Sequence, residues 1–192
     1  MNTISSQVMN EEQNLSVDNR VIPKEISVNE SLMYQTDYEL FLKSKRVARK
    51  TIVNQYKSDI LNVITNDIFE AGIISQSEFY ISDTANEDNV EYIREAANEL
   101  YLEYYNNPHI LTGLLIMMGT LNYEKAEPQG QTMALGLLQH EDISVRDRAI
   151  QAFERWNSKK GLTVLKSLHC DIKWLERYVN KVISYLERDG KD

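Results

Sequence analysis

The chain has 192 residues, 42% of them hydrophobic, and its 21 basic and 29 acidic side chains give a formal net charge of −8. That length can bury a core without disulfides, and 7 glycines and 3 prolines are too few for a collagen-like, loop-rich or wholly disordered chain. A net-acidic chain is also a poor default binder of nucleic acid.

The sequence carries no sign of secretion or of a membrane span. Cys170 is the single cysteine, so no intrachain disulfide can form, which argues against a small secreted scaffold. The first residues lack a basic stretch followed by an apolar core, so we expect no signal peptide. The longest uncharged apolar run, residues 110–123, is shorter than the ~20 residues that span a bilayer. A cytoplasmic protein without membrane contact is therefore expected.

The N-terminal third divides into a tail, a helix and a loop. Residues 1–30 are rich in Asn, Ser, Gln and Glu and lack aromatic residues, which predicts a flexible tail. Residues 31–71 place apolar side chains three and four positions apart, which predicts a long helix capped by Gly72. A break near residues 43–50 would bring this helix to a more usual length. Residues 73–86 mix β-branched, aromatic and turn residues and are interpreted as a loop or a short extended piece.

Helical periodicity continues to the C-terminus. Further helices are expected at 87–106, 109–122, 128–139, 143–157, 161–168 and 172–188. No segment is typical of a β-strand, so the fold class is all-α. The expected organisation is the tail, a helical N-terminal part over residues 31–107, and helices over residues 108–192 that pack on it as one domain.

Two C-terminal stretches repeat with an offset of 29 residues. Residues 135–156 and 164–186 each hold the end of an apolar helix, an acidic turn and a second, amphipathic helix. At this offset Val145 corresponds to Trp174. Both Trp156 and Trp174 are therefore expected in the core.

The first stretch resembles a HEAT-type α-helical repeat, which consists of an apolar helix, a turn with Asp, then Val-Arg and two spaced alanines. Here these residues are Leu137, Leu138, Asp142, Val145, Arg146, Ala149 and Ala152. The second stretch departs from the pattern, as a terminal unit can. The resemblance implies a short right-handed HEAT-like α-solenoid, with an irregular helical bundle as the alternative. We expect Asp142 to cap the helix that follows it and Arg146 to reach a nearby carboxylate or carbonyl.

Glutamate occupies every fourth position of the expected helix 87–106. The acidic ridge that this spacing predicts consists of Glu87, Glu91, Glu95, Glu99 and Glu103. Like charges four residues apart on a helix repel by a few tenths of a kcal/mol per pair, roughly. The ridge therefore costs local stability and is a candidate partner-binding surface, with a solvated face as the plain alternative.

Two basic surfaces are further candidates. The stripe on the first helix consists of Lys43, Arg46, Lys50 and Lys57. It can face the acidic ridge within the molecule or across a dimer, contact phosphates, or be solvated. In HEAT-like proteins the second helix of each repeat commonly lines a concave binding surface, so the resemblance implies a modest basic groove. Its residues are Arg148, Arg155, Lys173, Arg177, Lys181 and Arg188.

The sequence offers no catalytic, cofactor or metal site. His169 adjoins Cys170, but adjacent residues rarely form a nucleophile–base pair, and the three histidines lie far apart. No glycine-rich phosphate-binding loop occurs. We therefore expect a non-catalytic macromolecule-binding protein of adaptor, regulatory or inhibitor (immunity) type, most simply one that binds another protein. Alternatives are nucleic-acid association through the basic surfaces, homo-oligomerisation, and an unrecognised enzyme.

Overall fold

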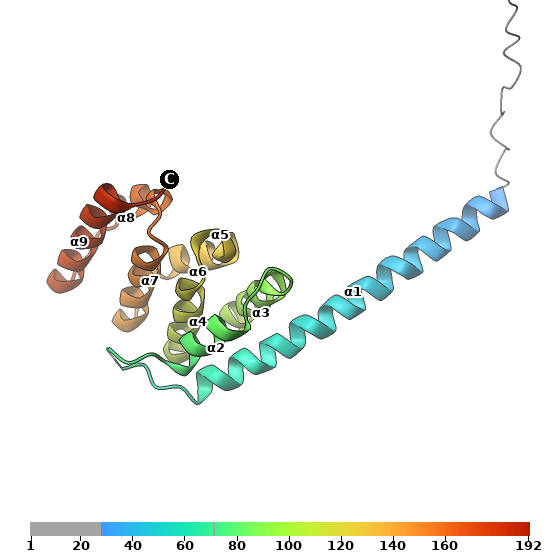
Figure 1. Cartoon of the computed structure of the whole chain (residues 1–192), viewed down its shortest axis with the longest axis horizontal. Coiled ribbons are helices and arrows are strands. Elements are labelled where there is room, and N and C mark those ends of the chain that lie inside the picture. Colours follow the sequence, from blue (N-terminus) through green and yellow to red (C-terminus); the bar gives the residue numbers. More distant parts are fainter. Residues whose placement is uncertain (1–27, 71) are drawn as a thin grey trace, which may run out of the picture. The chain divides into compact units, whose positions relative to one another are not determined.

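The structure, a computed structural model, describes residues 28–70 and 72–192. The chain divides into two compact units, residues 1–42 and 43–192. All regular elements of the described part are helices, which confirms the all-α prediction (Figure 1). The tail expected over residues 1–30 lies outside the described residues, apart from the first turn of the first helix.

Helix α1 (Val28–Thr65) runs without interruption, so the predicted break is wrong. The C-terminal cap predicted at Gly72 is also wrong, because the helix ends at Thr65. The cause is Asp67, whose carboxylate accepts hydrogen bonds from the backbone N–H groups that follow and turns the chain away from the helix axis. Gly72 instead adopts φ of +83° in the loop, a conformation that favours glycine.

Helix α2 (Gln76–Thr84) lies where a loop was predicted, and that prediction is wrong. The hydroxyl of Ser75 accepts a hydrogen bond of 3.1 Å from the N–H of Glu78. The sequence Ser-Gln-Ser-Glu at 75–78 is thus a capping signature, whose effect outweighs the β-branched and aromatic residues around it. Ile81 is buried and joins α2 to the core.

The middle of the chain forms two long helices and one short one: α3 (Val90–Glu103), α4 (Pro108–Thr120) and α5 (Tyr123–Ala126). Helix α4 starts as the sequence predicts, with Pro108 in its first turn and the side chain of Asn107 accepting from the N–H of Ile110. Residues 110–119 of α4 are all buried. A Cβ on Gly119 would lie 3.2 Å from Cα of Ala152, so α4 closely approaches the later helix that contains Ala152, α7 (Ile143–Trp156).

The C-terminal part contains α6 (Gln129–Leu137), α7 (Ile143–Trp156), a 3₁₀ turn (Lys159–Gly161), α8 (Leu162–Ser167) and α9 (Lys173–Asp189). Asp142 caps α7 as predicted, because its carboxylate accepts from the N–H groups of Ser144 and Val145. Arg146 also meets a carboxylate as predicted, with 2.9 Å between its Nη1 and Oδ1 of Asp171.

The buried positions of α7 and α9 match at a spacing of 30 residues, one more than the predicted repeat offset of 29. The buried positions of α7 and α9 that correspond are Val145 with Leu175, Ala149 with Val179, Ala152 with Val182, and Trp156 with Leu186. Trp174, expected in the core, is 45% exposed. The shift arises because α9 is preceded by Ile172 at the cap position, whereas Asp171 lies one residue earlier and pairs with Arg146.

A single core of buried side chains runs from Val53 to Leu186. Helix α4 packs on α7, and α7 packs on α9. Beside them α3 packs on α6, and each of α4, α7 and α9 also contacts the helix before it in the chain, namely α3, α6 and α8. Figure 1 shows α4, α7 and α9 following one another across the second unit. Helix α7 therefore lies between α4 and α9 and contacts both of them.

Candidate functional site

The acidic ridge of α3 is neutralised within the chain by the second half of α1. Arg49 Nη2 lies 2.8 Å from Glu91 Oε1 and 2.5 Å from Glu95 Oε2. Nζ of Lys50 lies 2.6 Å from Oε1 of Glu99, and Nζ of Lys57 lies 3.6 Å from Oε2 of Glu99 and 2.5 Å from Oε2 of Glu103. The remaining member, Glu87, was expected on this helix but precedes α3, which begins at Val90, and it pairs with Lys125 of α5 at 2.7 Å.

The ion pairs shift the pKa values of their members. The hydrogen bond from Lys50 and the charges of both lysines lower the pKa of Glu99, against its partial burial. The hydrogen bond to Glu103 raises the pKa of Lys57. Of the alternatives for the basic stripe, contact with the ridge inside the molecule is therefore the one observed, and the ridge needs no second molecule to offset its charge.

Arg49 is the central cation of this contact, although the predicted stripe did not include it. One helical turn separates it from Val53, which is fully buried, so periodicity could have placed Arg49 at the edge of the face that packs on the core. Its guanidinium also lies 5.1 Å from the ring centroid of Tyr92. Lys43 and Arg46 are exposed and take part in no ion pair among the described residues.

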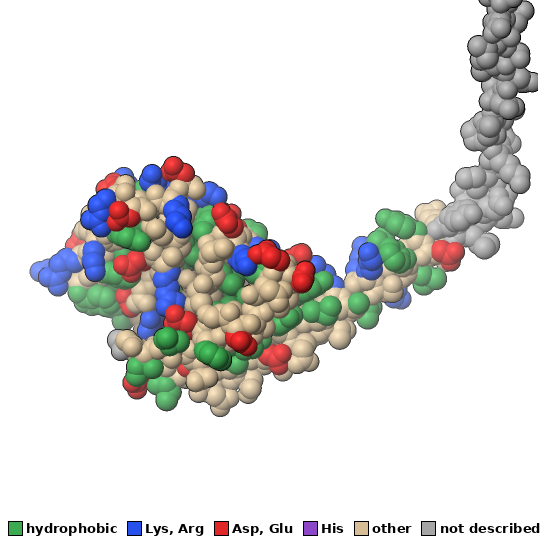
Figure 2. Space-filling view, in the orientation of Figure 1, with side chains coloured by type: hydrophobic (Ala, Val, Ile, Leu, Met, Phe, Trp, Pro, Cys, Tyr) green, Lys and Arg blue, Asp and Glu red, His purple; other side chains and the backbone are tan. Residues whose placement is uncertain are grey.

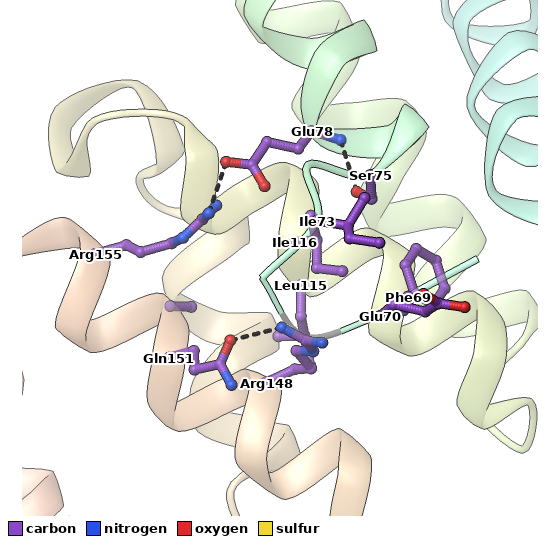
Figure 3. Close-up of a pocket in the computed structure, with 11 residues that line it drawn as sticks. Phe69, Glu70, Ile73, Ser75, Glu78, Leu115, Ile116, Arg148, Gln151 and Arg155 are labelled. Carbon is purple, nitrogen blue, oxygen red and sulfur yellow. Dashed lines mark hydrogen bonds and ion pairs between the residues drawn. The ribbon is translucent and has the colours of Figure 1, made fainter. Parts of the chain in front are cut away.

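A groove follows the exposed side of α7, and three adjoining hollows form it. The first lies between α7, α4 and the α1–α2 loop (residues 66–70 and 72–75), and Figure 3 shows Arg148, Gln151 and Arg155 reaching into it. Arg155 also lines the second hollow, beside α9, and Arg148 also lines the third, beside the start of α4. We call this the α7 groove. Its main residues are Phe69, Ile73, Arg148, Gln151, Arg155, Trp174 and Tyr178.

Hydrogen bonds fix the polar floor of the α7 groove. Arg155 Nη2 lies 2.6 Å from Glu78 Oε1 of α2, and its Nη1 donates to Thr120 Oγ1 of α4 at 2.9 Å. Arg148 donates to Oε1 of Gln151 at 2.7 Å, the contact drawn in Figure 3. The Arg155 contacts tie α7 to α2 and α4, and the Arg148 contact, which lies within α7, holds that guanidinium group in place.

The side of the α7 groove toward α9 has a second hydrogen-bonded pair. The hydroxyl of Tyr178 donates to Oε2 of Glu154 at 2.5 Å. Burial, and then this hydrogen bond, raise the pKa of Tyr178, so its hydroxyl remains protonated. Burial likewise raises the pKa of Asp147, which accepts a hydrogen bond from Gln151. Such fixed polar groups suit recognition of a partner's backbone and side chains.

Large apolar side chains are exposed along the two edges of the α7 groove. Ile73 in the α1–α2 loop is 63% exposed, and Trp174 at the start of α9 is 45% exposed. The same loop exposes Ile68 and Ile74 by 71% and 73%. Figure 2 shows hydrophobic side chains beside basic ones over the visible part of this unit. Clusters of exposed isoleucine and tryptophan are typical of protein-binding surfaces.

The structure divides the predicted C-terminal basic set. Arg148 and Arg155 lie in the α7 groove. The three lysines and arginines on the first half of α9 are exposed, whereas Arg188 pairs with its neighbour Asp189 at 2.8 Å. The members on the first half of α9 are Lys173, Arg177 and Lys181, and Arg188 is exposed as well. Ile73 and Trp174 were not predicted as site residues. For Ile73 the sequence offered one signal, the adjacent pair Ile73-Ile74 in a segment without helical periodicity.

Four further observations concern metal binding, the single cysteine, membrane-spanning helices and relatives. Within the described residues, no group of three His, Cys, Asp or Glu side chains is arranged to hold a metal ion. Burial raises the pKa of the Cys170 thiol, which makes it a weak nucleophile at neutral pH. In the part of the chain that the structure describes, no helix combines the length and apolarity needed to cross a bilayer. No family model, curated protein or solved structure matches this chain.

Proposed function

We propose that this chain is a non-catalytic, cytoplasmic protein-binding module, of adaptor, regulatory or inhibitor type, and that its partner lies across the α7 groove. The observation that carries the proposal is that the exposed apolar side chains of Ile73 and Trp174 lie at the two edges of the groove, with the hydrogen-bonded arginines between them. Burying one such side chain in a partner is worth about 1.5–3 kcal/mol. Tryptophan and arginine are also the residues most enriched among binding hot spots.

The fold that supports this proposal is a short α-solenoid of HEAT-like form. The 30-residue spacing of buried positions in α7 and α9 supports it, as do the contacts of α4 with α7 and of α7 with α9. In that arrangement α4, α7 and α9 are the inner helices, and the α7 groove lies on the surface that solenoid proteins use for binding. The resemblance of residues 135–156 to a HEAT repeat agrees with this assignment.

Protein is favoured over nucleic acid as the partner. Arg49, Lys50 and Lys57 are engaged by glutamates of α3, so most of the cations facing that side are already neutralised. Carboxylates also lie among the arginines of the α7 groove, at Glu78 and Glu154. Phosphate binding depends on uncompensated Lys and Arg charges, whereas in the α7 groove Arg155 is paired with Glu78 and Arg148 lies close enough to Asp147 for their charges to interact.

Affinity capture from the native cell with quantitative mass spectrometry tests the proposal. The wild type is compared with Ile73→Ala/Trp174→Ala and with a matched control, Leu102→Ala, whose side chain is 67% exposed on α3. We expect a protein that the wild type and the control retain and that the double variant loses by at least about tenfold. An unchanged set of captured proteins would refute the assignment of the groove, and loss of capture after nuclease treatment would support the nucleic-acid alternative instead.

A further inference from the structure

Another hollow, separate from the three that form the α7 groove, lies between the end of α1 and α2 and shares no residue with them. Its lining residues are Asn62, Val63, Asn66, Gln76, Phe79, Tyr80 and Asp83. We call it the α1–α2 hollow. The carboxylate of Asp67 accepts from the N–H groups of Gln76 and Ser77, so the start of α2 is fixed beside the end of α1 and the two walls are held together.

The floor of the α1–α2 hollow is apolar and aromatic. Phe79 is 64% exposed, an unusual state for phenylalanine on a helix that is anchored to a core. Val63 and Tyr80 are half-buried beside it and pack against the core. Burial raises the pKa of Tyr80 to about 12, so its hydroxyl stays neutral. An apolar side chain placed on Phe79 would therefore meet an aromatic surface that is already formed.

Two aspartates lie at or near the α1–α2 hollow. Asp83 lines it, and Asp59 lies close enough to Tyr80 for its charge to contribute to the raised pKa of that hydroxyl. Neither aspartate takes part in an ion pair among the described residues. The last turns of α1 and α2 also contain no basic residue, so the partial negative charge of each helix end is not offset there.

The surrounding sequence supplies no cation. From Ser58 to Ile93 the chain contains eight acidic residues and no Lys or Arg. This acidity differs from that of the acidic ridge, because the ridge is paired with α1 and Lys125, whereas Asp83 in the hollow and Asp59 beside it are in no ion pair among the described residues. The complement of this surface is therefore a ligand with positive charge beside an apolar group.

We propose that the α1–α2 hollow binds a cationic amphipathic helix of a partner protein. An apolar side chain of that helix rests on Phe79, and a Lys or Arg about one turn away faces Asp59 and Asp83. The α1 wall from Asp59 to Thr65, where the helix ends, covers six residue steps, or about 9 Å, which matches somewhat less than two turns of such a helix. Arg or Lys can also bind the faces of Phe79 and Tyr80 through cation–π contacts. Phosphate-bearing ligands are repelled, so nucleic acid and anionic lipid do not fit.

Fluorescence anisotropy with three labelled model peptides tests this assignment. The first is an amphipathic Leu/Lys helix of about 15 residues. The second has the same composition in an order without helical periodicity, and the third carries Glu in place of Lys. We expect the first to bind the wild type at least about tenfold more tightly than the other two, with an affinity that falls as salt increases. Equal binding of the permuted or the Glu peptide would overturn the proposal.

Variants locate the binding and separate it from the α7 groove. Phe79→Ala should abolish binding of the Leu/Lys helix, and Asp59→Asn/Asp83→Asn should weaken it and flatten its salt dependence. Asp83→Lys, at an exposed position, should abolish it without affecting the fold. Leu102→Ala and the groove variant Ile73→Ala/Trp174→Ala should bind as the wild type does. Unchanged affinity of the Phe79 or Asp83 variants would overturn the proposal while leaving the function of the α7 groove untouched.

Discussion

Asp67 holds the α1–α2 loop in place, and its replacement by alanine is the most informative perturbation of the fold. The side chain is 6% exposed. Its Oδ1 accepts from the N–H groups of Ile68 at 2.8 Å and Gln76 at 3.0 Å, and its Oδ2 accepts from the N–H of Ser77 at 2.7 Å. Burial alone would raise the pKa of Asp67, but the donors on Ser77, Gln76 and Ile68 outweigh it and the pKa is lowered.

The size of the effect follows from these three hydrogen bonds. A hydrogen bond to a charged group contributes about 1.5–3 kcal/mol, and a buried donor left without a partner costs about 1–3 kcal/mol. Ser77 is buried and its N–H cannot be rehydrated, whereas Ile68 and Gln76 are exposed residues whose N–H groups can bind water in the variant. The hydrogen bond to Ser77 is lost in full and those to Ile68 and Gln76 are partly replaced by water, so Asp67→Ala should lower the free energy of unfolding by about 3 kcal/mol.

Urea unfolding at several pH values measures this effect and its sign. The pKa of Asp67 is lower in the folded state than in the unfolded chain, where it is roughly 4. The ionised carboxylate therefore stabilises the fold at pH values above that unfolded-state pKa. This contribution is lost as pH falls through the folded-state pKa. The difference between wild type and Asp67→Ala should therefore be full at neutral pH and shrink in acid. A neutral-pH difference below about 0.5 kcal/mol, or one that does not shrink, would refute the reasoning.

Three further outcomes are expected in the same unfolding assay. Trp156→Ala should cost about 3–5 kcal/mol, whereas Trp174→Ala should cost less than about 0.5 kcal/mol, and similar losses would contradict the 30-residue register. Gly113→Ala should destabilise the fold, because the new Cβ would lie 2.5 Å from a core isoleucine. Such overpacking costs about 1–3 kcal/mol, which outweighs the gain of roughly 1 kcal/mol from the higher helix propensity of alanine. Arg49→Glu should cost about 1 kcal/mol at low salt, and adding Glu95→Arg should recover part of it; strictly additive losses would exclude the pairing of α1 with α3.

Local signals predicted much of the C-terminal fold. Helix α7 combines strong periodicity with the cap Asp142, and α4 combines an apolar run with Asn107 and Pro108, so both start where the sequence indicates. Helix α2 was missed because part of its support is tertiary. The carboxylate of Asp67, nine residues before Gln76, accepts from its N–H group, and no local pattern reveals that contact.

The candidate site was predicted only in its charged residues. Arg148 and Arg155 share one side of α7, which helical periodicity alone can show. The position of Trp174 depends on where α9 begins, and an error of one residue moved it from the surface into the core of the expected repeat. The exposure of Ile73 depends on how the α1–α2 loop is anchored, which sequence spacing does not encode.

Site-specific photo-crosslinking in the native cell tests the central claim most directly, namely that the chain acts by binding a protein across the α7 groove. A photoreactive amino acid is placed at Ile73, at Trp174 or, as a control, at the exposed Leu102 of α3. The account predicts that the first two positions crosslink to the same partner protein and that the third does not. A partner crosslinked from Leu102 and from neither groove position would contradict it.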